Sequence, residues 1–237
     1  MDVRVTVCLP TYNERENLEP MVRALSEQGV SVLVIDDSSP DGTGELADRL
    51  ATELENVDVL HRETKEGLGP AYLAGFRQAL AGGADLILEM DADFSHDPSD
   101  VPRLVQSAGE ADIVLGSRYV EGGSIRNWGR LRRFVSAGGS GYARRVLGVH
   151  VHDLTGGFKC FRREVLETID LDAITSRGYA FQIETTYRAL RAGFRVVEIP
   201  IAFVDRERGG SKMSRGIVLE AIWRVPMLRL RALLGRL

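Results

Sequence analysis

The sequence lacks several features that would each point to a particular class of protein. It has no apolar run of the roughly 18 residues that a membrane-spanning helix needs. It also does not begin with the charged and then apolar segments of a signal peptide. Its 2 cysteines are too few for a disulfide framework, and its net charge of -4 disfavours a nucleic-acid partner. These absences predict a cytoplasmic protein, either soluble or bound peripherally to a membrane.

The order of apolar runs and helical patterns predicts one large α/β domain. The 237 residues, 44% hydrophobic and 27% charged, are enough for one such domain with a full core. Short apolar runs alternate with helical segments, which is typical of a mostly parallel twisted sheet flanked by helices. We expect strands at 3–9, 30–35, 57–61, 86–90, 113–116, 153–161 and 195–200. Helices are expected at 14–28, 41–54, 67–81, 98–109, 131–147 and 179–192.

The remaining segments predict two loops and a terminal extension. Residues 121–128 are rich in glycine and residues 205–215 are polar, so both are expected to be flexible loops. We expect residues 1–215 to form the single domain and residues 216–237 to form a C-terminal amphipathic helical extension.

Two aspartates, Asp91 and Asp93, follow the apolar run 86–90 and give the strongest chemical signal. Side chains at i and i+2 of an extended chain point to the same side, and the carboxyl end of a buried strand is where α/β sheets bind ligands. Mg²⁺ or Mn²⁺ binds carboxylate oxygens together with substrate phosphates. The alternative is a solvated or capping cluster on a turn. We favour a metal site, in which the ion would act as a Lewis acid on a diphosphate leaving group.

Two further segments follow predicted strands and suggest a nucleotide pocket. Asp37 ends the run VLVIDD, where its carboxylate could accept hydrogen bonds from a base or a ribose. The segment LPTYNE joins the first strand to the first helix, and Tyr12 within it could stack on a base. For both segments the alternative is helix capping.

Several segments, in order along the chain, resemble those of dolichyl-phosphate mannose synthases, which are family 2 glycosyltransferases of the GT-A type. They are LPTYNERENL, VIDDSSPDGT, GLGPAYLAGF, MDADFSHDP, GSRY, DLTGGFKCFRREVL, GYAFQIE and VDRERGGSK. They extend from about residue 3 to residue 212, so the resemblance covers nearly the whole chain. The first, the sixth and the last are more specific than the others, which related transferases share.

The resemblance implies a GT-A fold and an inverting transfer of mannose from GDP-mannose to dolichyl or polyprenyl monophosphate, giving polyprenyl-phosphate mannose and GDP. It implies a nucleotide pocket lined by Pro10, Tyr12, Glu14, Ile35 and Asp37. Donor diphosphate and metal would be held by Asp91, Ala92 and Asp93. A third metal ligand of some relatives is replaced here by Ser95, which could act directly or through water, and His96 is a weaker candidate.

The resemblance also implies a set of cationic phosphate contacts. Arg118 in GSRY would contact the donor or acceptor phosphate, and Arg206 and Lys212 would close over the phosphates. Arg132 and Ser136 resemble acceptor-phosphate contacts. Arginine offers a planar fork that matches phosphate oxygens, and lysine offers a point charge. Because a phosphate monoester is already largely ionised, we expect no dedicated general base, and we expect catalysis by positioning and charge neutralisation.

A polyprenyl phosphate lies in a bilayer, so the protein must reach one. The run IVLEAIWRVPMLRLRALLGRL would place leucines and Trp223 on one side of a helix with Arg224 and Arg231 facing away, as in an interfacial helix. The alternatives are a helix packed on the domain or in a homodimer. Because no spanning segment is present, membrane contact would be peripheral or through a partner protein.

Two other functions remain open from the sequence. A related transferase could place glucose or another sugar from a different nucleotide sugar on a polyprenyl phosphate or on a saccharide, although a saccharide acceptor would need a general base that is not evident. A non-catalytic nucleotide-sugar-binding protein would be expected to have lost the Asp91 and Asp93 pair or its phosphate contacts, and these are present.

Overall fold

The computed structural model describes residues 3–205, 215–235 and 237. The first half of the chain alternates strands and helices: β1 (Val5–Thr11), α1 (Arg15–Ser26), β2 (Ser31–Asp36), α2 (Thr43–Glu53), β3 (Val57–His61), α3 (Leu68–Ala81), β4 (Leu86–Glu89), α4 (Val101–Ser107) and β5 (Ile113–Ser117). The second half contains β6 (Ser124–Arg126), α5 (Arg130–Leu147), β7 (Lys159–Arg162), α6 (Arg163–Thr168), α7 (Gly178–Arg191), β8 (Val196–Pro200), β9 (Ala202–Val204) and α8 (Arg215–Leu233).

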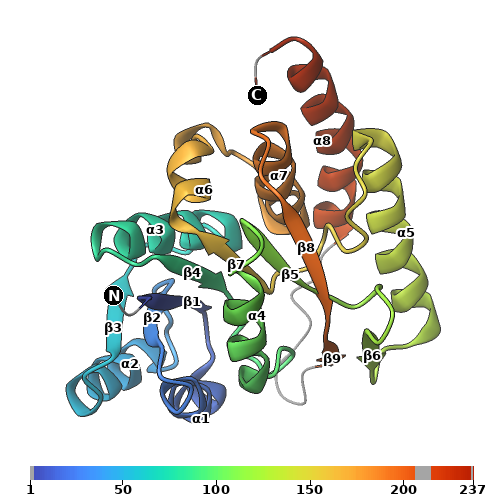
Figure 1. Ribbon diagram of the computed structural model, residues 1–237. Helices are drawn as coiled ribbons and strands as arrows, with labels where there is room; N and C mark the ends of the chain where they lie inside the picture. Colours follow the sequence, from blue (N-terminus) through green and yellow to red (C-terminus); the bar gives the residue numbers. More distant parts are fainter. Residues whose placement is uncertain (1–2, 206–214, 236) are drawn as a thin grey trace.

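Seven strands form the central sheet, in the order β3-β2-β1-β4-β7-β5-β8 (Figure 1). Only β7 is antiparallel to its neighbours β4 and β5, so the other strands of this sheet share one direction. The sequence-predicted, mostly parallel α/β fold is therefore confirmed. Because the strands are parallel, their carboxyl ends meet at one edge, and the loops that follow Thr11, Asp36, Glu89 and Ser117 lie along it.

Helices cover both faces of the sheet. One apolar core cluster packs β1 and β2 against α1, α2 and α4, with Leu18, Leu50 and Leu104 among its fully buried side chains. A second cluster lies on the other face, where Tyr72 of α3 stacks on Phe181 of α7. The two cysteines, Cys8 and Cys160, are buried free thiols in β1 and β7, as predicted. The runs of buried aliphatic residues therefore explain the central strands.

Some elements were not predicted from the sequence. The glycine-rich segment 121–128, predicted as a flexible loop, contains β6, which pairs with β9 in a small parallel sheet. The short strand and the short helix α6 carry too few residues to show a period. Residues 206–214 of the predicted loop 205–215 lie outside the part of the chain that the structure describes.

The C-terminal helix α8 packs beside α7 and α5 (Figure 1). Val225, Leu228 and Ala232 are buried in a third core cluster together with Leu147 of α5. Another stripe of α8 remains exposed, in which Trp223 is 78% and Leu233 69% exposed. One side of the helix therefore packs on the domain, while another side shows apolar residues to solvent. Within the described ranges, no helix is both long enough and apolar enough to cross a bilayer.

Candidate active site

The candidate site lies at the edge where the parallel strands end. Asp37 follows β2, Asp91 and Asp93 follow β4, and Arg118 follows β5. These positions are far apart in the sequence, and the register that pairs Cys8 with Glu89 and Pro10 with Ile35 brings the strand ends together. The edge therefore carries both carboxylates and a guanidinium, as the sequence predicted for a ligand site of an α/β sheet.

The turn after β4 fixes the two aspartates. Asp93 is buried, and its Oδ1 accepts hydrogen bonds from the backbone N of Ser95 at 3.0 Å and from the Ser95 hydroxyl at 2.5 Å. Phe94 between them adopts a left-handed backbone with φ 59, a costly conformation for a bulky residue. Ser95 thus orients the carboxylate of Asp93, while the turn holds Asp91 beside it.

His96 follows this turn and is hydrogen-bonded to its first residue, Asp91. Its ring is buried, stacks on Phe158 at 5.0 Å between centroids, and contacts Phe203 edge-on at 5.4 Å. Burial lowers the pKa of His96 to about 4, and the carboxylate of Asp93 only partly opposes this shift. The neutral ring accepts a hydrogen bond at Nδ1 from the backbone N of Asp91 at 3.4 Å. His96 therefore supports the turn.

The carboxylates of Asp91 and Asp93 fit a hard divalent cation that takes its other ligands from a substrate and from water. In the described part of the chain, no group of three or more His, Cys, Asp or Glu side chains could hold a metal ion. The protein would therefore supply two carboxylates, and diphosphate oxygens and water would supply the rest. This is the ligand set with which Mg²⁺ is usually bound in phosphate-transferring sites.

The predicted nucleotide residues surround the ends of β1 and β2. Asp37 is buried, pairs with Arg62, and accepts a hydrogen bond from the backbone N of Gly67 at 3.3 Å. Lys65 lies over the ring of Tyr12, 3.5 Å from its centroid. Arg62 and Lys65 come from the segment between β3 and α3, so this loop brings positive charge to the predicted pocket. Sequence reasoning missed both residues, because single cations in a loop give no distinctive pattern.

Three other predicted nucleotide residues differ in their surroundings. Glu14 is the N-cap residue of α1, and its carboxylate accepts a hydrogen bond from Asn17 at 3.0 Å. Pro10 is partly exposed in β1. Ile35 is fully buried in the core cluster that also contains Cys8. The side chain of Ile35 therefore packs in the interior, and only its backbone lies at the edge of the candidate site.

Arg118 is held by a buried carboxylate that sequence reasoning did not single out. Its Nε and Nη2 donate to Asp153 at 2.7 and 2.6 Å, and Nη2 also donates to Thr155 at 3.0 Å. The side chains of Arg118 and Asp153 are 5% and 0% exposed. Burial opposes the charge of Arg118, but Asp153 outweighs it and raises the pKa of the guanidinium. Arg118 thus connects the end of β5 to the DLTGG segment.

Arg132 and Ser136 lie on the first turns of α5 and face the same edge region. Both carboxylate oxygens of Asp205 accept from Nη1 of Arg132, at 2.9 and 2.8 Å. The ring of Trp128 lies 4.1 Å from the Arg132 guanidinium carbon. Ser136 accepts a hydrogen bond from the hydroxyl of Tyr119 at 2.8 Å. The predicted cations Arg206 and Lys212 lie outside the described residues.

A buried ion pair lies at the end of β4, two residues before Asp91. Glu89 ends β4 and Lys159 begins β7, their side chains are both 0% exposed, and the two charged atoms are 3.9 Å apart. Lys159 also donates to the backbone oxygen of Gln182 at 3.0 Å. Burial raises the pKa of Glu89 to about 7, and the charge of Lys159 partly opposes this shift. Through Lys159, the pair therefore connects α7 to β4, the strand that Asp91 follows.

Comparison with known proteins agrees with this architecture. The model of the glycosyl transferase family 2 matches residues 6–170. An undecaprenyl-phosphate mannosyltransferase of Micrococcus luteus is 51% identical over 223 residues, which cover 93% of this chain and 91% of the relative. A polyprenol monophosphomannose synthase of Mycolicibacterium smegmatis is 49% identical, over 98% of this chain and 89% of the relative.

Solved structures share the fold at much lower sequence identity. The glucosyl-3-phosphoglycerate synthase of Mycobacterium tuberculosis, in complex with Mn²⁺, UDP and glucosyl-3-phosphoglycerate, superposes with a TM-score of 0.64 at 21% identity. The similarity covers 99% of this chain and 80% of that one. A mannosyltransferase of Pyrobaculum calidifontis, in complex with GDP-mannose and Mn²⁺, has a TM-score of 0.60 at 17% identity, over 99% and 75% of the two chains. The architecture is thus the GT-A fold.

Proposed function

The chain belongs to the glycosyl transferase family 2, and on this basis we propose that it transfers mannose from GDP-mannose to a polyprenyl monophosphate. The products would be polyprenyl-phosphate mannose and GDP. The observation that carries the proposal is the pair Asp91 and Asp93 on a hydrogen-bonded turn at the carboxyl end of β4. Two carboxylates in this position could bind the metal ion that accompanies a diphosphate donor. The sugar and the acceptor class are supported by two relatives that are about half identical over nearly the whole chain.

The donor would bind along the ends of β1, β2 and β4. Tyr12 and Asp37 would contact the nucleoside, with Pro10, Glu14 and the backbone of Ile35 beside it. Arg62 and Lys65, already in place at Asp37 and Tyr12, would bring positive charge near the nucleotide. Asp91, Ala92 and Asp93 would hold the diphosphate through Mg²⁺ or Mn²⁺. When bound, this ion would neutralise the charge that develops on the leaving diphosphate.

The acceptor phosphate would bind between the end of β5 and the first turns of α5. Arg132 and Ser136 lie there, and Arg118 would add positive charge on the β5 side. Arg206 and Lys212 would contact phosphate oxygens as well. An ionised phosphate oxygen needs no proton removed before it attacks the anomeric carbon. The residues would therefore act by binding and orienting the two anions, and in-line attack would invert α-linked mannose to a β-linked mannosyl phosphate.

Transfer of radiolabelled mannose tests this proposal. With GDP-mannose, a polyprenyl phosphate in detergent and Mg²⁺ or Mn²⁺, we expect label in an organic-extractable lipid that mild acid releases. A chelator should abolish the transfer, and UDP-glucose should serve poorly as a donor. Transfer from UDP-glucose but not from GDP-mannose would replace the donor and keep the site, whereas an α-linked product or a stable glycosyl-enzyme would contradict the inverting mechanism.

We further propose that α5 and α8 bring the enzyme to the cytoplasmic face of a membrane. The surface consists of Leu131, Phe134 and Val135 of α5 with Ile222 and Trp223 of α8, all exposed, Leu131 and Phe134 at 77%. Arg130 and Arg133 are exposed in the same turns of α5. Apolar side chains next to arginines are typical of a helix surface that binds anionic lipid. Arg132 lies in the same turns of α5, so binding here would place the acceptor phosphate near the site.

Flotation with vesicles checks this contact. We expect the wild-type protein to float with vesicles that contain anionic phospholipid, and the double substitution Phe134→Ser and Trp223→Ser to reduce the bound fraction by about tenfold, since each removes a large apolar side chain from the lipid. Val3→Ser is the matched control, because Val3 is 60% exposed at the other end of the chain. Equal flotation of all three proteins would contradict the proposal. If the wild-type protein forms a homodimer and does not bind vesicles, the surface instead contacts a second copy of the chain.

A further inference from the structure

Asp205 binds only one of the three guanidinium nitrogens of Arg132. Both oxygens of Asp205 bind the same nitrogen, Nη1, whereas the stronger arrangement for arginine is a fork in which two nitrogens each bind one oxygen. Nε of Arg132 is buried and has no hydrogen-bond partner among the residues that the structure describes. The guanidinium is also stacked on Trp128, so it has lost water on one face. Arg132 therefore retains a donor that lacks an acceptor.

The neighbouring residue Trp128 has the same deficiency. The residue is 7% exposed, and within the described part of the chain its buried Nε1 has no hydrogen-bond partner. Buried N–H groups are nearly always paired in folded proteins, and an unpaired one is costly. Two unpaired donors in one small cluster point to a ligand that is rich in acceptor oxygens. A tetrahedral phosphate has more acceptor oxygens than the carboxylate of Asp205.

Asp205 is delivered to Arg132 by the small sheet. β9 ends at Val204, which is in register with Arg126 of β6, and the backbone N of Asp205 donates to the oxygen of Arg126 at 3.2 Å. The side chains of Arg132 and Asp205 are 25% and 27% exposed, so solvent reaches the pair. The pair also lacks the two-nitrogen fork that makes an arginine–carboxylate pair strong, because both oxygens bind Nη1. A stronger anion can therefore replace the carboxylate.

These contacts lead to an inference that rests on the proposed function. We propose that Asp205 is an internal anion that occupies Arg132 until the phosphate of the lipid acceptor displaces it. The carboxylate neutralises the partly desolvated guanidinium in the absence of acceptor. A phosphate dianion then takes its place because it carries more charge and can bridge two nitrogens of Arg132. Asp205 and the acceptor thus compete for one cation, and the competition sets the affinity for the acceptor.

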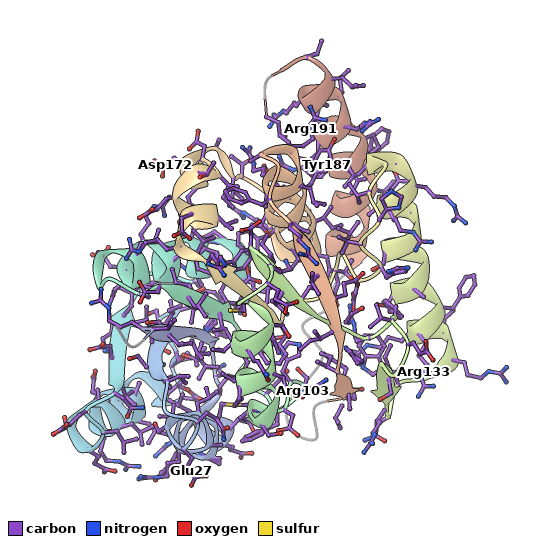
Figure 2. The ribbon with its side chains drawn as sticks, in the orientation of Figure 1. Glu27, Arg103, Arg133, Asp172, Tyr187 and Arg191 are labelled. Carbon is purple, nitrogen blue, oxygen red and sulfur yellow. The ribbon has the colours of Figure 1, made fainter. Side chains whose placement is uncertain are left out.

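The test compares Asp205→Asn, Asp205→Glu and wild-type enzyme in steady-state transfer. We expect Asp205→Asn to lower the KM for polyprenyl phosphate by about two- to fivefold, the fold-change that corresponds to a weak ion pair. Its KM for GDP-mannose should not change, and Asp205→Glu, which keeps the competing charge, should resemble the wild type. Asp172→Asn is the matched control, since Asp172 pairs with Arg77 on the surface. Figure 2 shows Asp172 on the opposite side of the molecule from Arg133, the neighbour of Arg132.

Calorimetry with a soluble short-chain prenyl monophosphate provides a second readout that does not need catalysis. Asp205→Asn should bind this probe about two- to fivefold more tightly than the wild type, and the difference should vanish in an Arg132→Leu background. An acceptor affinity that falls or stays constant in Asp205→Asn would overturn the inference and leave the proposed function intact. Absence of transfer by the wild type would instead refute the proposed function, and the calorimetry would still decide the competition at Arg132.

Discussion

Replacing Asp93 by asparagine is expected to reduce mannose transfer by about 10³-fold, because a metal-bound diphosphate contributes several kcal/mol to transition-state stabilisation. The change is nearly isosteric, and the amide oxygen can still accept from the backbone N and hydroxyl of Ser95, as Oδ1 of Asp93 does now. The turn should therefore keep its shape while the charge is lost. The measurement is kcat/KM for GDP-mannose, together with the thermal midpoint, which should stay within a few degrees.

Asp97→Asn is a matched control for this change. Asp97 lies four residues later in an equivalent turn, in which its Oδ1 accepts from the backbone N of Ser99 at 2.9 Å. It is exposed and does not belong to the candidate metal pair. We expect transfer by Asp97→Asn to stay within about twofold of the wild type, because its removal leaves the charge at Asp91 and Asp93 intact. Equal losses in both variants, or a fully active Asp93→Asn, would contradict the metal site.

Replacing Asp153 by asparagine is expected to lower the free energy of unfolding by about 3–5 kcal/mol, the usual result of breaking a buried ion pair at one partner. The amide nitrogen would face the N–H groups of Arg118, and the guanidinium would remain buried without its counter-charge. Urea denaturation measures the effect. Transfer should fall as well, since the pair fixes the end of β5.

The surface pair of Arg77 and Asp172 gives the comparison for Asp153. Asp172 is 86% exposed, so Asp172→Asn should change the free energy of unfolding by about 0–1 kcal/mol. If Asp153→Asn cost no more than Asp172→Asn, the buried pair with Arg118 would not stabilise the fold. A cost in the expected range with normal transfer would separate the structural role of Arg118 from its proposed contact with phosphate.

The sequence predicts the parts of the fold that local patterns determine. Buried strands such as β2 are short runs of mostly aliphatic residues, and Asp91 and Asp93 come just after another such strand, β4. The fold, and the place of Asp91 and Asp93 after a buried strand, could therefore be predicted from neighbouring residues. The GT-A resemblance then implied roles for residues such as Tyr12 and Arg132, for which the residues alone left capping or a solvated surface open.

The contacts that hold the site together could not be predicted in this way. Arg118 meets Asp153 across 35 residues, and Arg132 meets Asp205 across 73 residues. Such pairs depend on the positions of whole strands, for example on β7 inserting in the antiparallel direction between β4 and β5. A lone aspartate in DLTGG or VDRERGG carries no sign of its partner in a single sequence. The resemblance indicated that these segments matter, and the structure shows which cation each aspartate binds.

Mass spectrometry of the lipid product tests the central claim most directly. The enzyme is incubated with GDP-mannose, a polyprenyl phosphate of one defined length and Mg²⁺ or Mn²⁺, and both the lipid and the released nucleotide are quantified. The account predicts that the lipid gains one hexose residue, that mild acid removes it, and that one GDP is released for each lipid modified. Release of GDP without any gain in the mass of the lipid, or an unchanged lipid and an unchanged donor, would contradict it.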